Sequence, residues 1–138
     1  MDNLVQRLSQ IFREFQPDEV LLPDRYDIHT DHRATFDAAA ACTKGFRYPS
    51  VRRVLTYETP SETDFSLDPA GGFRPNYFFD ISDHLEAKLQ LLQTYGSEIA
   101  PPPFPRSLEN LRALATQQGA QVGCAAAEGL GILKWVEK

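Results

Sequence analysis

Residues 19–57, EVLLPDRYDIHTDHRATFDAAAACTKGFRYPSVRRVLTY, decide the fold that the sequence predicts. The segment opens with a short apolar run at residues 19–22, closed by proline and aspartate, which is typical of a buried strand. The alanine-rich residues 31–44 contain neither glycine nor proline, and they favour a helix that stops at the next glycine. Residues 51–57 have the β-branched and aromatic content of a second strand. A helix between two strands predicts an α/β fold with a parallel sheet.

The rest of the chain continues this alternation. Apolar residues recur every three or four positions near the start, which indicates an amphipathic helix, and a long polar loop at residues 59–76 is a candidate lid. The last segment is mostly apolar, contains three glycines, and is expected to pack on the sheet as a helix. We therefore expect helices at residues 2–15, at 85–95, after Ser107 and at 122–136, with a third strand at 77–81.

Composition restricts the function. The 138 residues, 42% hydrophobic and 24% charged, are ordinary for one soluble globular domain, residues 1–138. The net charge of -5 offers no positive field for many phosphates, so a nucleic-acid partner is not expected. No apolar stretch reaches the roughly 20 residues of a membrane span, and no secretory signal is recognisable, which favours the cytoplasm. The two cysteines are expected to be structural.

The most informative residues follow the first predicted strand. His29 and His32 are three apart, with Asp31 between them, at the entry to a predicted helix. Two neutral imidazoles can there point toward one place while a carboxylate orients one of them, which is typical of metal or acid-base sites. The alternative is that Asp31 only caps the helix and both histidines are solvated. A catalytic zinc usually takes three protein ligands, so other groups must contribute, and His84 is not expected to be one.

A family resemblance is carried by these residues. PDRYDIHTDHRATFDAA (residues 23–39) resembles the second motif of LmbE/PIG-L de-N-acetylases, and the match continues through TYETPSETDF, FRPNYFFDISDHLEAKLQLL and PFPRSLENLRALATQQGAQVG. The resemblance implies a Rossmann-like parallel sheet flanked by helices. It also implies zinc-dependent hydrolysis of the acetamide of N-acetylated amino sugars or their glycoconjugates.

The resemblance also implies roles for single residues. His32 matches the zinc ligand, His29 the catalytic general acid or oxyanion stabiliser, and Asp31 the carboxylate that orients His29. Glu58 and Arg106 are candidates for substrate binding. The family's first motif, His-Pro-Asp-Asp-Glu, supplies the remaining ligands and the base, and it does not occur in these 138 residues. We therefore expect the C-terminal part of the family domain, incomplete at its N-terminus and inactive by itself.

Three hypotheses stay open. The first is a zinc de-N-acetylase whose site is completed by a complementary N-terminal chain or a neighbouring subunit. The second is an inactive remnant that serves as an oligomerisation or interaction module, because unpaired strand edges favour association. Both predict a homo-oligomer. The third is a different hydrolase, or a metal-independent protein that stacks a sugar on Tyr26, Phe73 and Tyr77.

Overall fold

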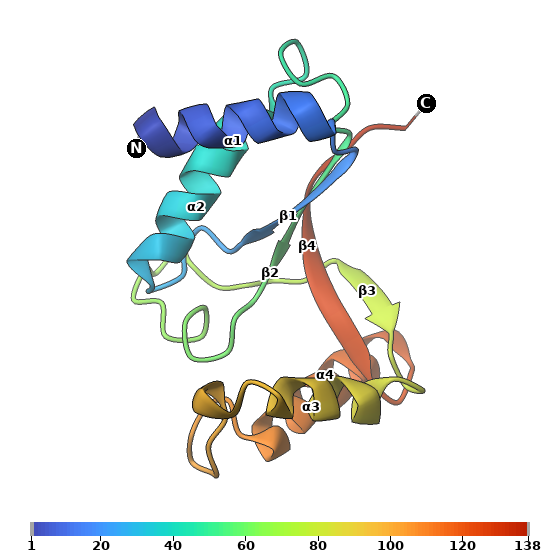
Figure 1. Ribbon diagram of the computed structural model, residues 1–138. Helices are drawn as coiled ribbons and strands as arrows, with labels where there is room; N and C mark the ends of the chain where they lie inside the picture. Colours follow the sequence, from blue (N-terminus) through green and yellow to red (C-terminus); the bar gives the residue numbers. More distant parts are fainter. Residues whose placement is uncertain (1, 138) are drawn as a thin grey trace. The chain divides into compact units, whose positions relative to one another are not determined.

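A mixed four-stranded sheet with flanking helices forms the framework of the computed structural model, which describes residues 2–137 (Figure 1). The strand order is β1-β2-β4-β3. β1 and β2 pair in parallel, from Glu19 opposite Arg53 to Pro23 opposite Tyr57, whereas β4 pairs with β2 in the antiparallel direction. The expected α/β fold is confirmed, and the sheet is mixed. The strands are β1 (Glu19–Pro23), β2 (Arg53–Tyr57), β3 (Tyr77–Asp80) and β4 (Ala127–Trp135).

The helices lie close to the ranges expected from the sequence. The Ser107 hydroxyl caps α4 by accepting a hydrogen bond from the Asn110 backbone N–H at 3.1 Å. The described residues contain no helix that is long and apolar enough to cross a membrane. The α-helices are α1 (Asp2–Phe15), α2 (Thr30–Ala40), α3 (Leu85–Gln93) and α4 (Leu108–Val122), and short 3-10 turns lie at η1 (Ala41–Thr43) and η2 (Gly96–Glu98).

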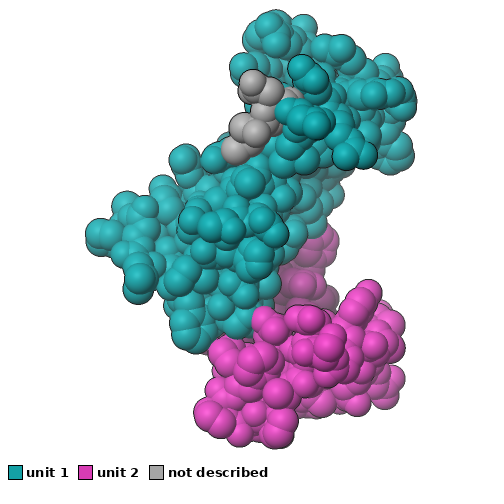
Figure 2. Space-filling model, turned by 60° about the vertical axis from the view of Figure 1, so that its left-hand side comes forward, with its two compact units in different colours: residues 1–74, 130–138 teal, residues 75–129 magenta. Residues whose placement is uncertain are grey.

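The chain forms two compact units (Figure 2). The first contains α1, α2, β1, β2 and the second half of β4, and the other comprises residues 75–129. β4 therefore supplies residues to both.

The core of the first unit explains why α1 and α2 pack on β1 and β2. Side chains alternate along a strand, so Leu22 points to one face and is 3% exposed, whereas its neighbour Leu21 is 48% exposed. Leu22 joins one buried apolar cluster with Phe12 of α1, Phe36 of α2 and Val54 of β2. Full burial of a side chain of this size stabilises the fold by roughly 1.5–3 kcal/mol.

The expected helix at residues 122–136 is wrong. α4 ends at Val122, and Gly123 follows in the left-handed conformation with a φ of 81°. Residues 127–135 then form β4, where Gly131 lies opposite Thr56. A Cβ atom at Gly131 would lie 2.6 Å from the Thr56 Oγ1, so a larger residue could not approach β2 this closely. Of the glycines in this segment, Gly123 ends α4 and Gly131 allows β4 to approach β2 closely.

Candidate active site

The histidine segment lies where β1 ends and α2 begins. We call residues 24–32 the half-site loop. Because β1 and β2 are parallel and Pro23 lies opposite Tyr57, the residues that follow both strands emerge at the same edge of the sheet. Glu58 directly follows β2 and therefore lies at the edge from which the half-site loop leaves. This placement agrees with the expectation that the loop after the first strand lines a ligand site.

The imidazole of His32 is held by a buried carboxylate. Asp27 is fully buried, and its Oδ2 atom lies 2.7 Å from the Nδ1 atom of His32. A carboxylate only accepts hydrogen bonds, so Nδ1 donates, and in the neutral imidazole Nε2 then keeps its lone pair. The His32 side chain is 30% exposed. This arrangement, in which a carboxylate fixes the tautomer of an accessible histidine, is the usual setting of a metal-ligating imidazole.

His29 lies beside His32, and its ring nitrogens have the opposite hydrogen-bonding roles. Its Nδ1 atom caps α2 by accepting a hydrogen bond from the Asp31 backbone N–H at 3.2 Å. The neutral ring therefore carries its hydrogen on Nε2. The two imidazoles stack with 4.9 Å between ring centroids and 25° between planes. The structure thus brings together one imidazole with a free lone pair and one with a free N–H donor.

The carboxylate bonded to His32 is that of Asp27, which the sequence reasoning missed. Asp31 lies in the first turn of α2 with an exposed side chain, and its backbone N–H, not its carboxylate, contacts His29. The cap of α2 is therefore His29 and not Asp31. Asp27 is five residues from His32, a separation that matches no helical or strand period, so no spacing rule marks it.

Several hydrogen bonds fix the half-site loop. The Arg33 Nη1 atom donates to the backbone oxygens of Asp27 at 3.0 Å and Ile28 at 3.1 Å. The Ile28 backbone N–H donates to the Glu62 carbonyl oxygen at 3.1 Å, which ties the loop to residues 59–63. The loop is therefore held in one conformation before any ligand arrives, which reduces the entropy that binding would cost.

A second buried carboxylate, Asp24, begins the loop. Burial raises the pKa of Asp24, the hydrogen bond from the Tyr26 N–H at 2.8 Å opposes this rise, and the nearby charge of Asp27 adds to it. A raised pKa means that ionisation is more costly in the folded than in the unfolded chain. The contribution of Asp24 to stability is therefore fully present below about pH 3.9 and is lost as the pH rises through the raised pKa.

Replacing Asp24 with asparagine should therefore stabilise the protein at neutral pH. Asparagine retains the oxygen that accepts the Tyr26 N–H and removes the buried charge. Thermal unfolding at pH 4 and pH 7 measures the effect: the midpoint of D24N should exceed the wild-type midpoint at pH 7, with a smaller difference at pH 4. A lower midpoint at pH 7 would show that the ionised carboxylate stabilises the loop.

The two predicted substrate-binding residues lie in different units. Glu58 is partly buried at the end of β2. Arg106 belongs to the unit formed by residues 75–129, where its Nη2 atom lies 3.1 Å from a Glu98 carboxylate oxygen and its Nε atom donates to the Glu98 carbonyl oxygen at 2.8 Å. Its guanidinium also lies 5.0 Å from the centroid of the Phe104 ring. The pocket roles of both residues stay predictions.

The described residues do not form a complete zinc site. Within residues 2–137 there is no group of three or more histidine, cysteine, aspartate or glutamate side chains placed to hold a metal ion. His32 fits one ligand position. The Oδ1 atom of Asp27 is buried without a hydrogen-bond partner in the described structure. Because the ligand set is incomplete, we derive no reaction step through zinc.

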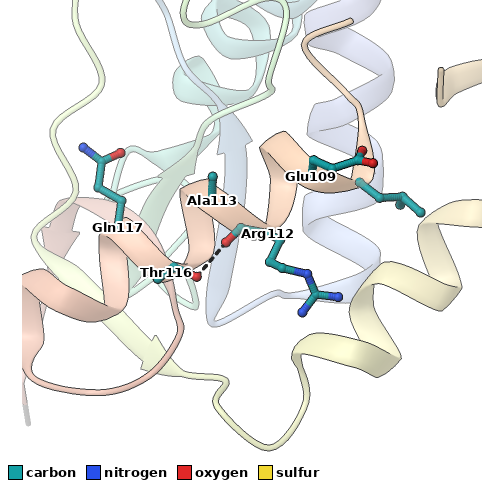
Figure 3. A pocket seen from close by; sticks show the side chains of 6 residues that line it. Glu109, Arg112, Ala113, Thr116 and Gln117 are labelled. Atoms are coloured by element: carbon teal, nitrogen blue, oxygen red, sulfur yellow. Dashed lines mark hydrogen bonds between the residues drawn. The ribbon is translucent and has the colours of Figure 1, made fainter. Parts of the chain in front are cut away.

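A separate hollow follows α4 in the other unit (Figure 3). It contains no histidine, and its polar groups are largely engaged. The Thr116 hydroxyl donates to the Arg112 carbonyl oxygen at 2.9 Å, and the Arg112 guanidinium is paired with Glu86. Glu109 is a carboxylate that lines this hollow, but no histidine lies beside it there.

Comparison with known proteins supports the assignment of the fold. The chain matches no family model. It is 31% identical over 136 residues to diacetylchitobiose deacetylase from Thermococcus kodakarensis, covering 91% of this chain and 48% of that protein. The solved N,N'-diacetylchitobiose deacetylase from Pyrococcus horikoshii is 25% identical, with a TM-score of 0.70 over 97% of this chain and 52% of that one. The chain therefore shares its fold with solved deacetylases.

The same fold also carries other chemistry. The structure of GalB, the 4-carboxy-2-hydroxymuconate hydratase from Pseudomonas putida, matches all of this chain and 61% of its own, with a TM-score of 0.70 and 20% identity. The chain spans about half the length of its curated deacetylase relative. The reaction therefore has to be argued from the site residues.

Proposed function

We propose that this chain is the part of an LmbE/PIG-L-type de-N-acetylase that carries the His-x-Asp-His half of a zinc site. Its reaction is hydrolysis of the acetamide of an N-acetylated amino sugar or its glycoconjugate. The remaining ligands and the base come from a further segment, of a longer polypeptide or another subunit. The observation that carries the proposal is the His32 imidazole, which Asp27 holds with Nε2 free.

The unpartnered oxygen of Asp27 supports completion by another segment. A buried acceptor without a donor costs about 1–3 kcal/mol. The Oδ1 atom of Asp27 has no donor in the described residues, although Oδ2 is bonded to His32. A segment or water that seats beside His32 and donates to this oxygen would remove that cost.

His29 is proposed to act on the oxygen of the scissile amide. Its Nε2–H group is not used by the helix cap, so it can donate to an oxygen on which negative charge develops. Loss of one such donor typically costs about a hundredfold to a thousandfold in rate. Asp31 is proposed to tune His29, while Glu58 and Arg106 are proposed to contact the sugar.

Reconstitution tests this proposal. The chain alone is expected to bind zinc weakly, since one ligand does not hold it. A segment bearing a strand followed by His-Pro-Asp-Asp-Glu should raise the zinc affinity measured by calorimetry. The mixture should also release acetate from N,N'-diacetylchitobiose. If zinc affinity and acetate release are the same with and without the added segment, the proposal is wrong.

A second candidate, an interaction module, is favoured by one observation. β1 is the edge strand of the sheet, and Leu21 in its middle is 48% exposed. Such an edge can pair with another copy of the chain.

The change Leu21→Lys places a charge on this edge and tests the module. If β1 mediates association, light scattering should show an oligomer for the wild type and a monomer for L21K, with little change in the midpoint of thermal unfolding. A wild-type chain that is monomeric at micromolar concentration contradicts the module.

A further inference from the structure

A cavity in the first unit is not used by the proposed reaction. It lies between the end of α1 and the segment that leads into β2. Gln16 and Ser50, which line it, each lie three residues before a strand, so the cavity is near the amino ends of β1 and β2. The half-site loop leaves the opposite, carboxyl ends. We propose that this cavity, here named the anion cavity, binds a small organic anion whose phosphate or carboxylate oxygens lie between Arg13 and Arg47.

Two unpaired guanidinium groups give the anion cavity its charge. The Arg13 and Arg47 side chains line it, and neither makes an ion pair or hydrogen bond within residues 2–137. No carboxylate lines it, and the neighbouring Glu14 accepts a hydrogen bond from Gln10 at 2.8 Å. The last turn of α1 contributes a partial negative charge of about one half, which two full positive charges exceed. An acidic chain thus has a local positive site suited to an oxyanion.

The anion cavity also has an apolar floor. Phe12 and Tyr48 are buried, and their rings meet edge to face with 6.0 Å between centroids. The Tyr48 hydroxyl donates to the Ser9 Oγ atom at 2.7 Å, so it is already occupied. This floor suits the apolar body of a ligand whose charged end reaches the arginines.

Further polar groups line the anion cavity. The Arg47 guanidinium lies 5.4 Å from the centroid of the Phe46 ring, a contact that restricts its position. Gln16 has a φ of 50°, the left-handed conformation that commonly ends a helix, and its N–H donates to the Phe12 carbonyl oxygen at 3.0 Å. The Gln16 amide and the Ser50 hydroxyl add neutral donors to the two charges.

The test uses the whole chain with a metal chelator present, so that it is independent of the zinc proposal. Inorganic phosphate, acetate, phenyl phosphate and benzoate are titrated at low ionic strength, and backbone amide shifts are followed by NMR. We expect saturable shifts at the anion cavity, with each aromatic anion binding more tightly than its inorganic or aliphatic counterpart. The phosphate and carboxylate arms show which oxyanion is preferred.

Substitutions of single arginines test which positive charge binds the anion. Arg47→Gln should weaken phenyl phosphate binding by at least about tenfold, because a charge-assisted hydrogen bond is lost. Arg47→Lys should bind with intermediate affinity, since it keeps the charge but loses the planar fork. Arg7→Gln is the matched control, because Arg7 is also exposed, lies on α1 and does not line the anion cavity. When R7Q and R47Q are both compared with screening salt added, R7Q should change the affinity less than about twofold, whereas R47Q should still weaken binding.

Three results would overturn the proposal. These are the absence of saturable shifts in the wild-type chain at millimolar anion, equal weakening by R7Q and R47Q, and shifts confined to residues outside the anion cavity. The midpoint of thermal unfolding checks that R47Q folds, and little change is expected because the Arg47 side chain makes no hydrogen bond or ion pair in the described chain.

Discussion

Replacing His32 with glutamine should remove zinc binding from the chain reconstituted with the added segment, and acetate release should stop. Glutamine keeps much of the side-chain volume but offers no imidazole nitrogen to the metal. A catalytic metal ion contributes several kcal/mol to transition-state stabilisation, so the rate should fall by at least about a thousandfold. Calorimetry with zinc and an acetate assay on N,N'-diacetylchitobiose measure the two effects.

His84→Gln provides the matched control for this change. His84 is exposed at the start of α3 and belongs to the other unit, so its loss should leave zinc affinity and rate unchanged. The H32Q chain should remain folded, because the His32 side chain is 30% exposed and glutamine keeps much of its volume. If H32Q binds zinc as tightly as the wild type, the ligand lies elsewhere.

Replacing Asp27 with asparagine should weaken zinc binding by about tenfold to a hundredfold, the usual effect of removing a carboxylate that orients a metal ligand. Asparagine fills the same buried space, and its oxygen can still accept from His32, but the negative charge that strengthens the imidazole as a ligand is lost. Alanine should weaken binding further, because the His32 ring then loses its described side-chain hydrogen bond.

Comparing the substitutions of Asp31 and Asp27 distinguishes the roles of the two carboxylates. Asp31→Asn should reduce the rate of acetate release through the proposed tuning of His29. It should leave zinc affinity nearly unchanged, since the Asp31 carboxylate is exposed and only the Asp31 backbone N–H contacts a histidine. Asp27→Asn, in contrast, should lower the zinc affinity, and the rate should fall because less zinc is bound. If D31N weakens zinc binding as strongly as D27N, the assignment of Asp27 to His32 is wrong.

The sequence predicted the parts of the fold that depend on local pattern. The apolar run of β1 and the alanine-rich α2 show their structure in consecutive residues, so both were found. The two histidines at the entry to α2 were found for the same reason. β4 was missed because a short apolar run with glycines fits a buried helix as well as a strand. Its identity depends on pairing with β2, more than 70 residues away in sequence.

Asp27 was missed for a different reason. Its burial and its contact with His32 arise from the path of the turn between β1 and α2, which Arg33 and Glu62 hold in place. No periodicity in the sequence encodes such a turn. The substrate contacts were beyond sequence reasoning as well, because Arg106 is paired with Glu98, a partner that pattern alone did not indicate.

Most of the described hydrogen bonds that hold the half-site loop are made between residues of the loop and the adjoining Arg33. Asp27, His29, His32 and Arg33 make their contacts within ten consecutive residues, and the Glu62 carbonyl oxygen is the main anchor outside them. A segment whose conformation depends mainly on hydrogen bonds between its own residues can be moved to another protein. Engineers could graft residues 24–33 onto another junction between a parallel strand and a helix, and so obtain a histidine pair with defined tautomers in an unrelated host.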